Sequence, residues 1–502
     1  MPLSRRTLLR AAVAVPATGA GPAAAAEPRT GDPKTGGATA GGATGSGPTA
    51  GDWKALAAGL EGKVELPGAA TFAEAHRLVD PRFDAVRPPA VARCAAPADV
   101  TEVIRFARRF GVPVVPRGGG HSYVGASTSR TGVVLDLRGL RAIGYDAGSR
   151  TATIGGGARL IDVYDRLDAH GVSIPSGSCG TVGIGGITLG GGIGMAASAY
   201  GMTCDAVTAA ELATADGRLR TVHAGREPEL FWALRGGGGG SLGVVTSWRM
   251  RTYPADPAGT FVLTYPWSAA ALVAAGWQAR LSRAPDETWS SCQFASDARG
   301  ARSVRISGVL LGGAADAEVA AIVRAIGREP ATVRVERLPH RTVVHNRGGC
   351  DDAGDCGPRA TELVGSDVFP RILPPAAVAA LLASVERRSK ARRPGIAKLK
   401  RMTGAQGRVA PGATAFPWRG VHTMLQWLVQ PATGDPATVR DAYAWIDDGH
   451  RAMARWSAGR YVNYLEPDPA QVPRYHGAHL ARLRRIRAAA DPDRLFRSPY
   501  AV

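Results

Sequence analysis

Two potential nucleophiles lie within glycine-rich segments of this sequence. His121 follows three glycines in VPRGGGHSYVGAS (residues 114–126), and Cys179 lies in GSCGTVGIGGITLGGGIG (residues 177–194). A third glycine-rich segment, LRGGGGGSLGVVTS, spans residues 234–247. Because glycine has no Cβ and tolerates positive φ, such segments can bring backbone N–H groups close to an anionic ligand such as a diphosphate. A neutral imidazole and a thiol beside that ligand could bond covalently to an electron-poor partner.

Three interpretations of His121 compete: a nucleotide phosphate loop, a plain turn that carries a histidine, and a histidine that is itself modified. A dinucleotide-binding Rossmann unit requires a strand, the glycine loop, a helix and an acidic residue further on. Here another strand, VVLDL, follows the loop. No Gly-Lys-Ser/Thr follows four variable residues, so the P-loop is also excluded. The glycine segments therefore predict some other nucleotide-binding fold.

The surrounding elements predict an α+β protein. Residues 97–112, PADVTEVIRFARRFGV, have helical apolar spacing, and VPVV reads as a strand that ends in the first glycine segment. VVLDL, ATIGGGA and VVTSWRMRTY add further strands. Residues 256–455 alternate helical segments (TYPWSAAALVAAGWQARL, AEVAAIVRAIG, ATVRDAYAWIDDGHRAMARW) with strands (FVLTYP, VRISGVLL, HTMLQWLVQ), which predicts an antiparallel sheet covered by helices.

Four motifs, in the same order along the chain, resemble the berberine-bridge-enzyme group of FAD-linked oxidases, which have the vanillyl-alcohol-oxidase fold. They are PRGGGHSYVGAS, GSCGTVGIGGITLGGGIGMAASAYGMTCD, ELFWALRGGGGGSLGVVTSWR, and YVNYLEPDP with DPDRLF. The resemblance implies a two-part FAD-binding domain and a separate α+β substrate domain. It also implies that His121 bonds the 8α-methyl of the flavin and that Cys179 bonds C6, as in the doubly tethered subgroup. Alone, His121 would be a turn histidine and Cys179 an inert buried thiol.

The same motifs predict the remaining cofactor contacts. Besides His121 and Cys179, the residues expected to bind FAD are Arg117, Gly118, Gly119, Gly120, Ser122, Gly125, Thr181, Val182, Gly185, Gly186, Gly190, Gly243, Val244 and Asn463.

The C-terminal Tyr-x-Asn-Tyr motif, read as a strand, resembles the segment that carries the catalytic base in sugar and polyketide-glycoside oxidases of this group. We expect Tyr464 to be the base, Tyr461 to line the site and Asn463 to hold the flavin. A phenol that titrates near 10 needs a neighbouring cation or the oxidised flavin to act at neutral pH. Without the family, aromatic packing in a strand would explain the motif. Gln406 and Gln426, expected on strands of the substrate domain, are further candidates for facing the flavin.

Val182 bears on the electron acceptor. In plant relatives a valine at this place resembles oxidases, whereas leucine resembles enzymes that prefer other acceptors, so O2 is favoured. Two departures from the family pattern put the substrate and one flavin contact in doubt. His479 stands near the place of an asparagine, and Phe416-Pro417-Trp418-Arg419 replaces an FPHR-like segment.

The predicted organisation has five parts. Residues 1–26, with Arg5-Arg6 before a short apolar stretch, form a twin-arginine signal that implies export of a folded, cofactor-loaded protein. A membrane anchor is the alternative, but the apolar stretch is shorter than the roughly 18 residues that a span requires. Residues 27–52 read as a flexible linker, 53–255 as the FAD-binding domain, 256–455 as the substrate domain, and 456–502 as a segment that returns to the FAD domain.

Charge and cysteines restrict the partners. The formal net charge is +19, but the arginines are scattered and no nucleic-acid motif accompanies them, so we expect no nucleic-acid partner. The six cysteines lack the paired spacing of a metal site, and no metal is expected. Cys350 and Cys356 flank a short acidic loop in which a disulfide and two free thiols are equally compatible with the sequence.

Three functions remain. The first is an exported, bicovalent FAD oxidase that oxidises an alcohol of a sugar, oligosaccharide or glycosylated natural product and reduces O2 to H2O2. The second is a dehydrogenase or oxidative cyclase of the same fold, which would release little peroxide. The third is a non-catalytic secreted protein that binds an anionic polymer, which leaves His121 and Cys179 unexplained.

Overall fold

The computed structural model describes residues 47–502. The predicted signal, residues 1–26, and most of the predicted linker lie outside the described residues. Helix α1 (Ala50–Ala58) begins earlier than the predicted linker end at residue 52, because Thr49 caps it. The Thr49 hydroxyl accepts a hydrogen bond from the Asp52 amide, while the Asp52 carboxylate accepts one from the Thr49 amide. The helix is anchored by burial of Trp53 and Leu56.

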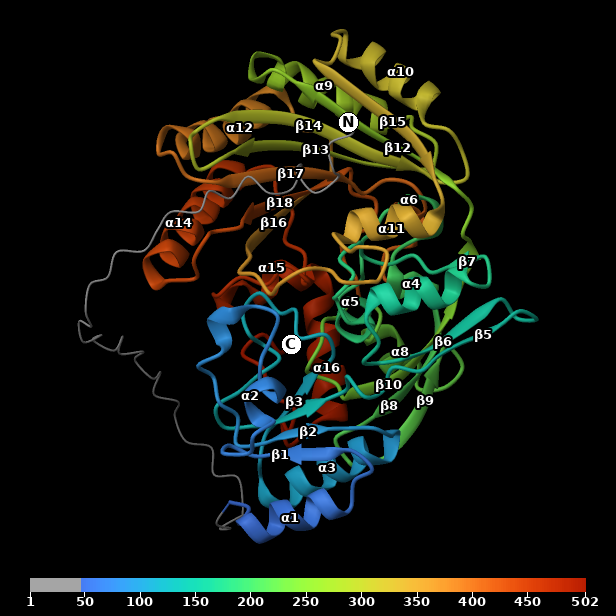
Figure 1. Cartoon of the computed structure of the whole chain (residues 1–502), viewed down its shortest axis with the longest axis vertical. Coiled ribbons are helices and arrows are strands. Elements are labelled where there is room, and N and C mark those ends of the chain that lie inside the picture. The colour runs from blue at the N-terminus through green and yellow to red at the C-terminus, as the bar shows by residue number, and fades with distance from the viewer. Residues whose placement is uncertain (1–46) are drawn as a thin grey trace. The chain divides into compact units, whose positions relative to one another are not determined.

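Two small sheets form the lower part of the structure as drawn in Figure 1. The four-stranded sheet has the order β1 (Lys63–Glu65), β2 (Val91–Arg93), β4 (Val133–Asp136), β3 (Val114–Arg117), and its β2–β4–β3 pairs are parallel. The antiparallel five-stranded sheet has the order β5 (Ile143–Asp146), β6 (Thr151–Gly155), β10 (Val244–Arg251), β8 (Val207–Ala213), β9 (Leu219–His223). A short pair, β7 (Val172–Ser173) with β11 (Tyr253–Pro254), leads toward the next sheet.

Helix α3 (Pro97–Phe110) fixes the approach to the first glycine segment. Its buried residues Val100, Val103, Ile104 and Ala107 recur at helical spacing and pack against the four-stranded sheet. Gly111 ends the helix with a φ of 65°, which lets the chain turn directly into β3. The predicted helix and strand are therefore present, and the strand leads directly into residues 118–121 of the first glycine segment.

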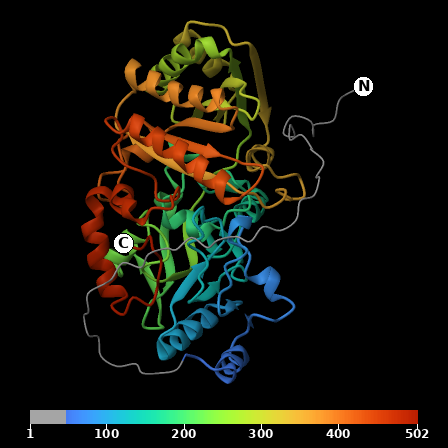
Figure 2. The ribbon, with the colours of Figure 1, turned by 90° about the vertical axis from the view of Figure 1, so that its left-hand side faces the viewer.

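The upper sheet of Figure 1 has seven antiparallel strands. Its order is β15 (Thr332–Leu338), β12 (Ala258–Tyr265), β14 (Arg302–Leu310), β13 (Thr288–Ser296), β17 (Gly395–Arg401), β18 (Thr423–Val429), β16 (Leu363–Phe369). Helices α9 (Ala270–Leu281), α10 (Asp316–Ile326), α12 (Pro375–Lys390) and α14 (Pro436–Met453) cover its outer face (Figures 1 and 2). Strand β12 runs to Tyr265, so the segment predicted as helical from TYPW becomes α-helical only at Ala270.

Strand alternation divides the side chains of this sheet between its two faces. Cys292, Phe294, Ala397 and Leu399 belong to the core under the covering helices. The alternate residues of β13 and β17, which include Lys398 and Lys400, therefore point to the opposite face. Helix α11 (His340–Gly348) lies at that inner face, against α4 (Leu160–Asp168) of the lower part (Figure 1).

The remaining helices are short or belong to connections. They are α2 (Phe72–Ala75), α5 (Ile184–Leu189), α6 (Ala197–Tyr200), α7 (Thr203–Ala206), α8 (Pro228–Ala233), α13 (Ala405–Arg408), α15 (Val472–His476) and α16 (Leu480–Ala490), with 3-10 turns at Pro81–Phe83, Trp267–Ala269, Pro469–Gln471 and Gly477–His479.

The C-terminal segment packs against the lower sheets, as its red ribbon shows in Figure 2. Val114 of β3 donates its amide to Leu495 and forms a parallel bridge with Phe496. Phe496 is fully buried in the core of the four-stranded sheet. The end of the segment is thereby bonded to the strand that leads to His121.

Candidate active site

His121 lies where β3 ends and the first glycine segment begins. Gly120 has a φ of 72°, a conformation that glycine adopts without strain. A Cβ on Gly119 would lie 2.3 Å from the backbone nitrogen of Gly183, so the first two glycine segments touch backbone to backbone. Burial lowers the pKa of His121 to about 4, so its imidazole is neutral near pH 7. Its Nε2 is buried and has no hydrogen-bond partner among the described residues.

Cys179 is a free, exposed thiol in the second glycine segment. The segment continues through Gly183 into α5, and Gly185, Gly186 and Ile187 of this helix line a cavity. The adjacent Gly180 packs against a disulfide between Cys350 and Cys356, because a Cβ there would lie 2.4 Å from the Cys350 sulfur. The structure therefore settles the open cysteine question in favour of the disulfide. It also places that disulfide beside the predicted flavin tether.

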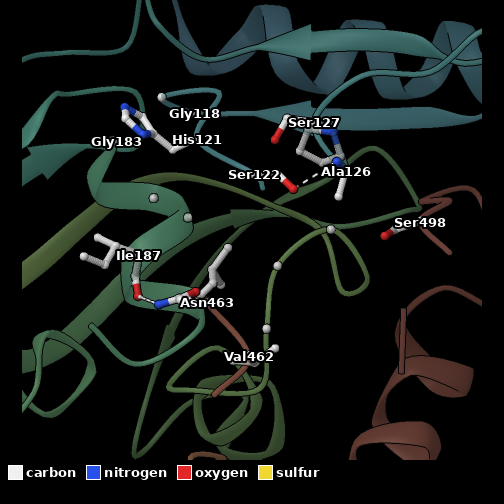
Figure 3. A pocket seen from close by; sticks show the side chains of 18 of the residues that line it. Gly118, His121, Ser122, Ala126, Ser127, Gly183, Ile187, Val462, Asn463 and Ser498 are labelled. Carbon is white, nitrogen blue, oxygen red and sulfur yellow. Dashed lines mark hydrogen bonds between the residues drawn. The ribbon is translucent and has the colours of Figure 1, made fainter. Parts of the chain in front are cut away.

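The three glycine segments and the C-terminal segment enclose one cavity. Figure 3 shows His121 and Ser122 of the first segment, Gly183 and Ile187 of the second, and Val462 and Asn463 of the C-terminal segment around it. Residues 237–240 of the third segment also line it, together with Ser498 and Tyr500. The predicted residues that line the cavity are Gly118, Gly119, Gly120, His121, Ser122, Val182, Gly185, Gly186, Gly243, Val244, Asn463 and Tyr464.

The other predicted residues do not line this cavity: Arg117, Gly125, Cys179, Thr181, Gly190 and Tyr461. Arg117 corrects an expectation, because its buried guanidinium pairs with Asp136 at 2.9 Å and donates to the carbonyl of His76. Arg117 therefore joins β3 to β4 and to the end of α2. Gly190 instead allows Asn463 to approach, since a Cβ there would overlap the Asn463 amide.

The Tyr-x-Asn-Tyr motif forms a turn, which corrects the predicted strand. The Tyr464 amide donates to the Tyr461 carbonyl, and this reversal allows the Asn463 side chain to donate to the carbonyl of Ile187 at 3.0 Å (Figure 3). Tyr461 is buried, and its hydroxyl accepts hydrogen bonds from the Gly192 amide and from Asn463. Tyr461 therefore holds the turn against the second glycine segment and does not line the cavity as predicted.

Tyr464 lines the cavity, and its hydroxyl is bonded to a residue that the sequence analysis missed. Lys400, on the inner face of β17, donates to the Tyr464 oxygen over 2.6 Å. Burial raises the pKa of Tyr464 and lowers the pKa of Lys400 to about 8. Tyr123, two residues after His121, packs edge-on against Tyr464 with ring centroids 6.0 Å apart. The phenol thus has a neighbouring amine with which it can exchange a proton.

The two glutamines differ in position. Gln426 is on β18, as expected, directly across from Lys398. Gln406 is on α13 and not on a strand, and its amide donates to the carbonyl of Arg401. The Gln406 prediction is therefore wrong in its element, because the glycine at position 404 adopts a φ of 87° and ends the extended chain.

The two departures from the family pattern are structural contacts in this chain. Arg419 forms a buried ion pair with Asp205 at 2.6 Å, which ties the residues after α13 to α7. Trp418 donates its indole N–H to the carbonyl of Arg460. His479 approaches the carbonyl of Ala415 with Nδ1 at 3.1 Å. Within residues 47–502, no cluster of three or more histidine, cysteine or acidic side chains is placed to hold a metal, and no helix is long and apolar enough to cross a membrane.

Comparisons with known proteins agree with this geometry. Residues 88–223 match the FAD binding domain family, and residues 460–502 match the family described as berberine and berberine like. An uncharacterized FAD-linked oxidoreductase, YgaK of Bacillus subtilis, is 29% identical over 83% of this chain and 91% of its own length. Xylooligosaccharide oxidase of Thermothelomyces thermophilus is 28% identical over 83% of this chain and 87% of its own length.

Solved structures give the same result. BBE-like 1 of Physcomitrella patens superposes with a TM-score of 0.80 at 25% identity, and the match covers 89% of this chain and 98% of that one. The fold and the matched segments define an FAD-linked oxidoreductase. This chain is similar to the berberine-bridge-enzyme-like FAD-linked oxidoreductases, which confirms the predicted α+β fold class and the predicted resemblance.

Proposed function

We propose that this protein is an FAD-dependent oxidase whose flavin is attached through His121 and Cys179. Its substrate is an alcohol of a sugar, oligosaccharide or glycosylated natural product, which is oxidised to a carbonyl while O2 is reduced to H2O2. The Tyr464–Lys400 hydrogen bond at the edge of the glycine-lined cavity carries the proposal, because alcohol oxidation needs a positioned base. The similarity to xylooligosaccharide oxidase supports the substrate class.

The residues present fit FAD. His121 is neutral, with a buried ring nitrogen that lacks a partner, and the glycines at positions 118–120 and 237–240 leave room for a ligand against the backbone. We assign the ring to His121, Cys179 and Asn463, and the diphosphate to the backbone of the glycine segments. When bound, the flavin supplies hydride acceptance from the substrate carbon and electron delivery to O2. Val182, the residue whose resemblance to oxidases favours O2 as the acceptor, lines the cavity.

The chain's own residues manage the proton. When Lys400 is neutral, it can accept the hydroxyl proton of Tyr464, so that the phenolate oxygen can accept the proton of the substrate hydroxyl. Lys400 then holds one proton. The substrate carbon loses its hydrogen together with both electrons of the C–H bond, as a hydride. Tyr461 and Asn463 keep the turn of Tyr464 fixed against the second glycine segment. The substrate loses two electrons and two protons, and these balance the reduction of O2 to H2O2.

The test is to denature the purified protein in acid and measure its colour and intact mass. We expect one FAD per chain to remain attached in the wild type, in His121→Ala and in Cys179→Ala, and to be lost in the double variant. His170→Ala, an exposed histidine away from the cavity, is the control. Peroxide release from oligosaccharides, measured with a coupled peroxidase, tests the reaction. A bare polypeptide mass for the wild type would contradict the tethering proposal.

We also propose export through the twin-arginine pathway, supported by Arg5-Arg6 and the following apolar residues. We expect a variant with Arg5→Lys and Arg6→Lys to accumulate in the cytoplasm with its flavin attached, as measured by cell fractionation. Equal export of the paired variant and the wild type would contradict this.

A further inference from the structure

A band of cations lies on the inner face of the seven-stranded sheet, next to the candidate base. We define this cationic band as Arg305 of β14, Lys398 and Lys400 of β17, and Arg347 near the end of α11. Arg305 and Lys398 are both directly opposite Gln293 of β13, so they stand in one row across three strands. Lys400 is two residues beyond Lys398 and therefore on the same face.

The other three cations act on Lys398. Burial and then the charges of Lys400, Arg347 and Arg305 lower the pKa of Lys398 to about 8. Burial and the charge of Arg305 lower the pKa of Arg347 to about 10. The strand register and the position of Arg347 over Trp289 of β13 agree that these groups lie close together. They therefore form one positive region beside Tyr464.

Few carboxylates balance this band. The charge of Glu362 favours the protonated forms of Lys398 and Lys400 and so partly opposes the lowering of their pKa values. The Oε1 atom of Glu362 also accepts a hydrogen bond from Gln430 at 2.7 Å. Among residues 47–502, no salt bridge and no side-chain hydrogen bond engages the side chains of Lys398, Arg305 or Arg347. Arg347 lies over the ring of Trp289, 4.6 Å from its centroid, which covers one face of the guanidinium and leaves its N–H edge available. Lys398 and Arg347 are half-buried, whereas Arg305 is exposed. A half-buried cation without a partner is costly unless a ligand supplies the countercharge, and this cost applies to Lys398 and Arg347.

The cofactor diphosphate is not that ligand. None of the four cations lines the glycine-rich cavity, whereas Tyr464 does. Lys400 is hydrogen-bonded to Tyr464, which lines the cavity, so the cationic band lies next to the cavity. Helix α11 brings Arg347 to the same region, because the neighbouring Gly348 packs against the carbonyl of Ser178, next to Cys179. The band thus borders the place where the substrate alcohol must meet the base.

We infer that this enzyme oxidises an anionic carbohydrate, and that Arg305, Arg347 and Lys398 bind the carboxylate of a uronic or aldonic acid unit while Tyr464 meets the alcohol. The inference rests on the proposed function for the identity of the reacting group. Gln293 and Gln426, both directly opposite Lys398 on the neighbouring strands, add uncharged donors for sugar hydroxyls. Guanidinium and ammonium groups bind carboxylates through charge-assisted hydrogen bonds, which are stronger than neutral ones.

The binding experiment uses the holoenzyme and three probes: trigalacturonate, its methyl ester and inorganic sulfate. Because lysines of lowered pKa are acylated preferentially near pH 8, trace acetylation followed by peptide mass analysis reports the accessibility of Lys398. We expect trigalacturonate or sulfate to slow acetylation of Lys398 and the ester to have no effect. Lys54, an exposed lysine on α1, is the internal reference. Equal protection by the ester, or no protection by either anion, would overturn the inference.

The activity experiment separates this inference from the proposed function. With the double variant Arg305→Gln and Lys398→Gln, we expect the KM for acidic oligosaccharides to rise by about tenfold or more while kcat changes little. Arg334→Gln is the matched control, since Arg334 lies on the edge strand β15 and pairs with Glu336. Peroxide release that is faster with neutral sugars than with acidic ones would leave the oxidase proposal intact and refute the anionic substrate. Protection of Lys398 by anions without any sugar oxidation would refute the oxidase proposal alone.

Discussion

At the scale of single residues, the site combines groups whose ionisation is shifted in opposite directions. Burial keeps His121 neutral and lowers the pKa of Lys400 to about 8, while it raises the pKa of Tyr464. A neutral imidazole is a nucleophile, whereas a protonated one is not. An amine that loses its proton near neutral pH can relay protons from a phenol that would otherwise stay protonated. The same physical cause, burial, therefore suits His121 to the attachment and Lys400 to the proton transfer that we propose for them.

The Lys400–Tyr464 pair predicts a pH dependence. Above about pH 8 the pair has lost one proton and can accept the substrate proton, so the rate of anaerobic flavin reduction should rise with pH and level off above about 8. In Lys400→Met, this rise should move to higher pH and the rate near neutrality should fall about 100-fold. Stopped-flow flavin reduction across the pH range measures both.

The matched control for this experiment is Lys54→Met, which removes an exposed lysine of α1 that has no bond to Tyr464. It should keep the pH at which the rate levels off near that of the wild type. An unchanged pH profile in Lys400→Met would show that Lys400 does not exchange protons with the base.

At the scale of elements, the loop between α11 and β16 stabilises the second glycine segment. The Cys350–Cys356 disulfide packs against Gly180, and His345 of the same helix approaches Asp165 of α4 with 2.7 Å between Nε2 and the carboxylate. The loop between α11 and β16, in the predicted substrate domain, therefore helps to position Cys179, whereas the end of β3 positions His121. The two predicted tethers depend on different elements.

Loss of the disulfide should accordingly affect one tether more than the other. In a His121→Ala background, Cys350→Ser with Cys356→Ser should lower the fraction of FAD that survives acid denaturation, because Cys179 is less well positioned. In a Cys179→Ala background the fraction should be unchanged. The global cost is about 2 kcal/mol for so short a loop. Equal loss in both backgrounds would indicate general destabilisation and contradict a specific effect on Cys179.

The elements near the first glycine segment were predictable because local signals define them. The helical spacing before Gly111 and the β-branched run after it specify α3 and β3, and the glycines mark the approach of a ligand. Lys400 was missed because its bond to Tyr464 joins positions 64 residues apart, through a strand register that a sequence does not reveal. The alternating lysines in IAKLKR were the available signal. The turn at residues 461–464 was mistaken for a strand because aromatic residues favour strands.

At the scale of the whole molecule, buried charges join the seven-stranded sheet to the C-terminal segment. His450 of α14 lies between two carboxylates, 2.7 Å from Asp367 of β16 and 2.8 Å from Glu466. Burial opposes a charge on His450, but the two carboxylates outweigh it and raise the pKa to about 9. Protonated His450 therefore stabilises the association of these parts.

This contact predicts how stability depends on pH. The folded pKa is above the unfolded value of about 6.5, so the contribution of His450 is complete below about pH 6.5 and disappears as pH rises through about 9. Its full size is about 3 kcal/mol. The difference in unfolding free energy between the wild type and His450→Gln should therefore shrink from pH 6 to pH 10, about the range spanned by the two pKa values. Denaturant titrations at each pH measure it, and a difference that grows with pH would contradict the assignment.

The bond between Val114 and residues 495–496 has a consequence for biosynthesis. Residues 114–121 leave the ribosome long before Ser498 and Tyr500, which also line the glycine-rich cavity. A nascent chain therefore lacks one wall of the cofactor cavity until residues 498–500 have left the ribosome. We expect ribosome-bound chains that stop before Asp491 to stay colourless however much FAD the cell contains.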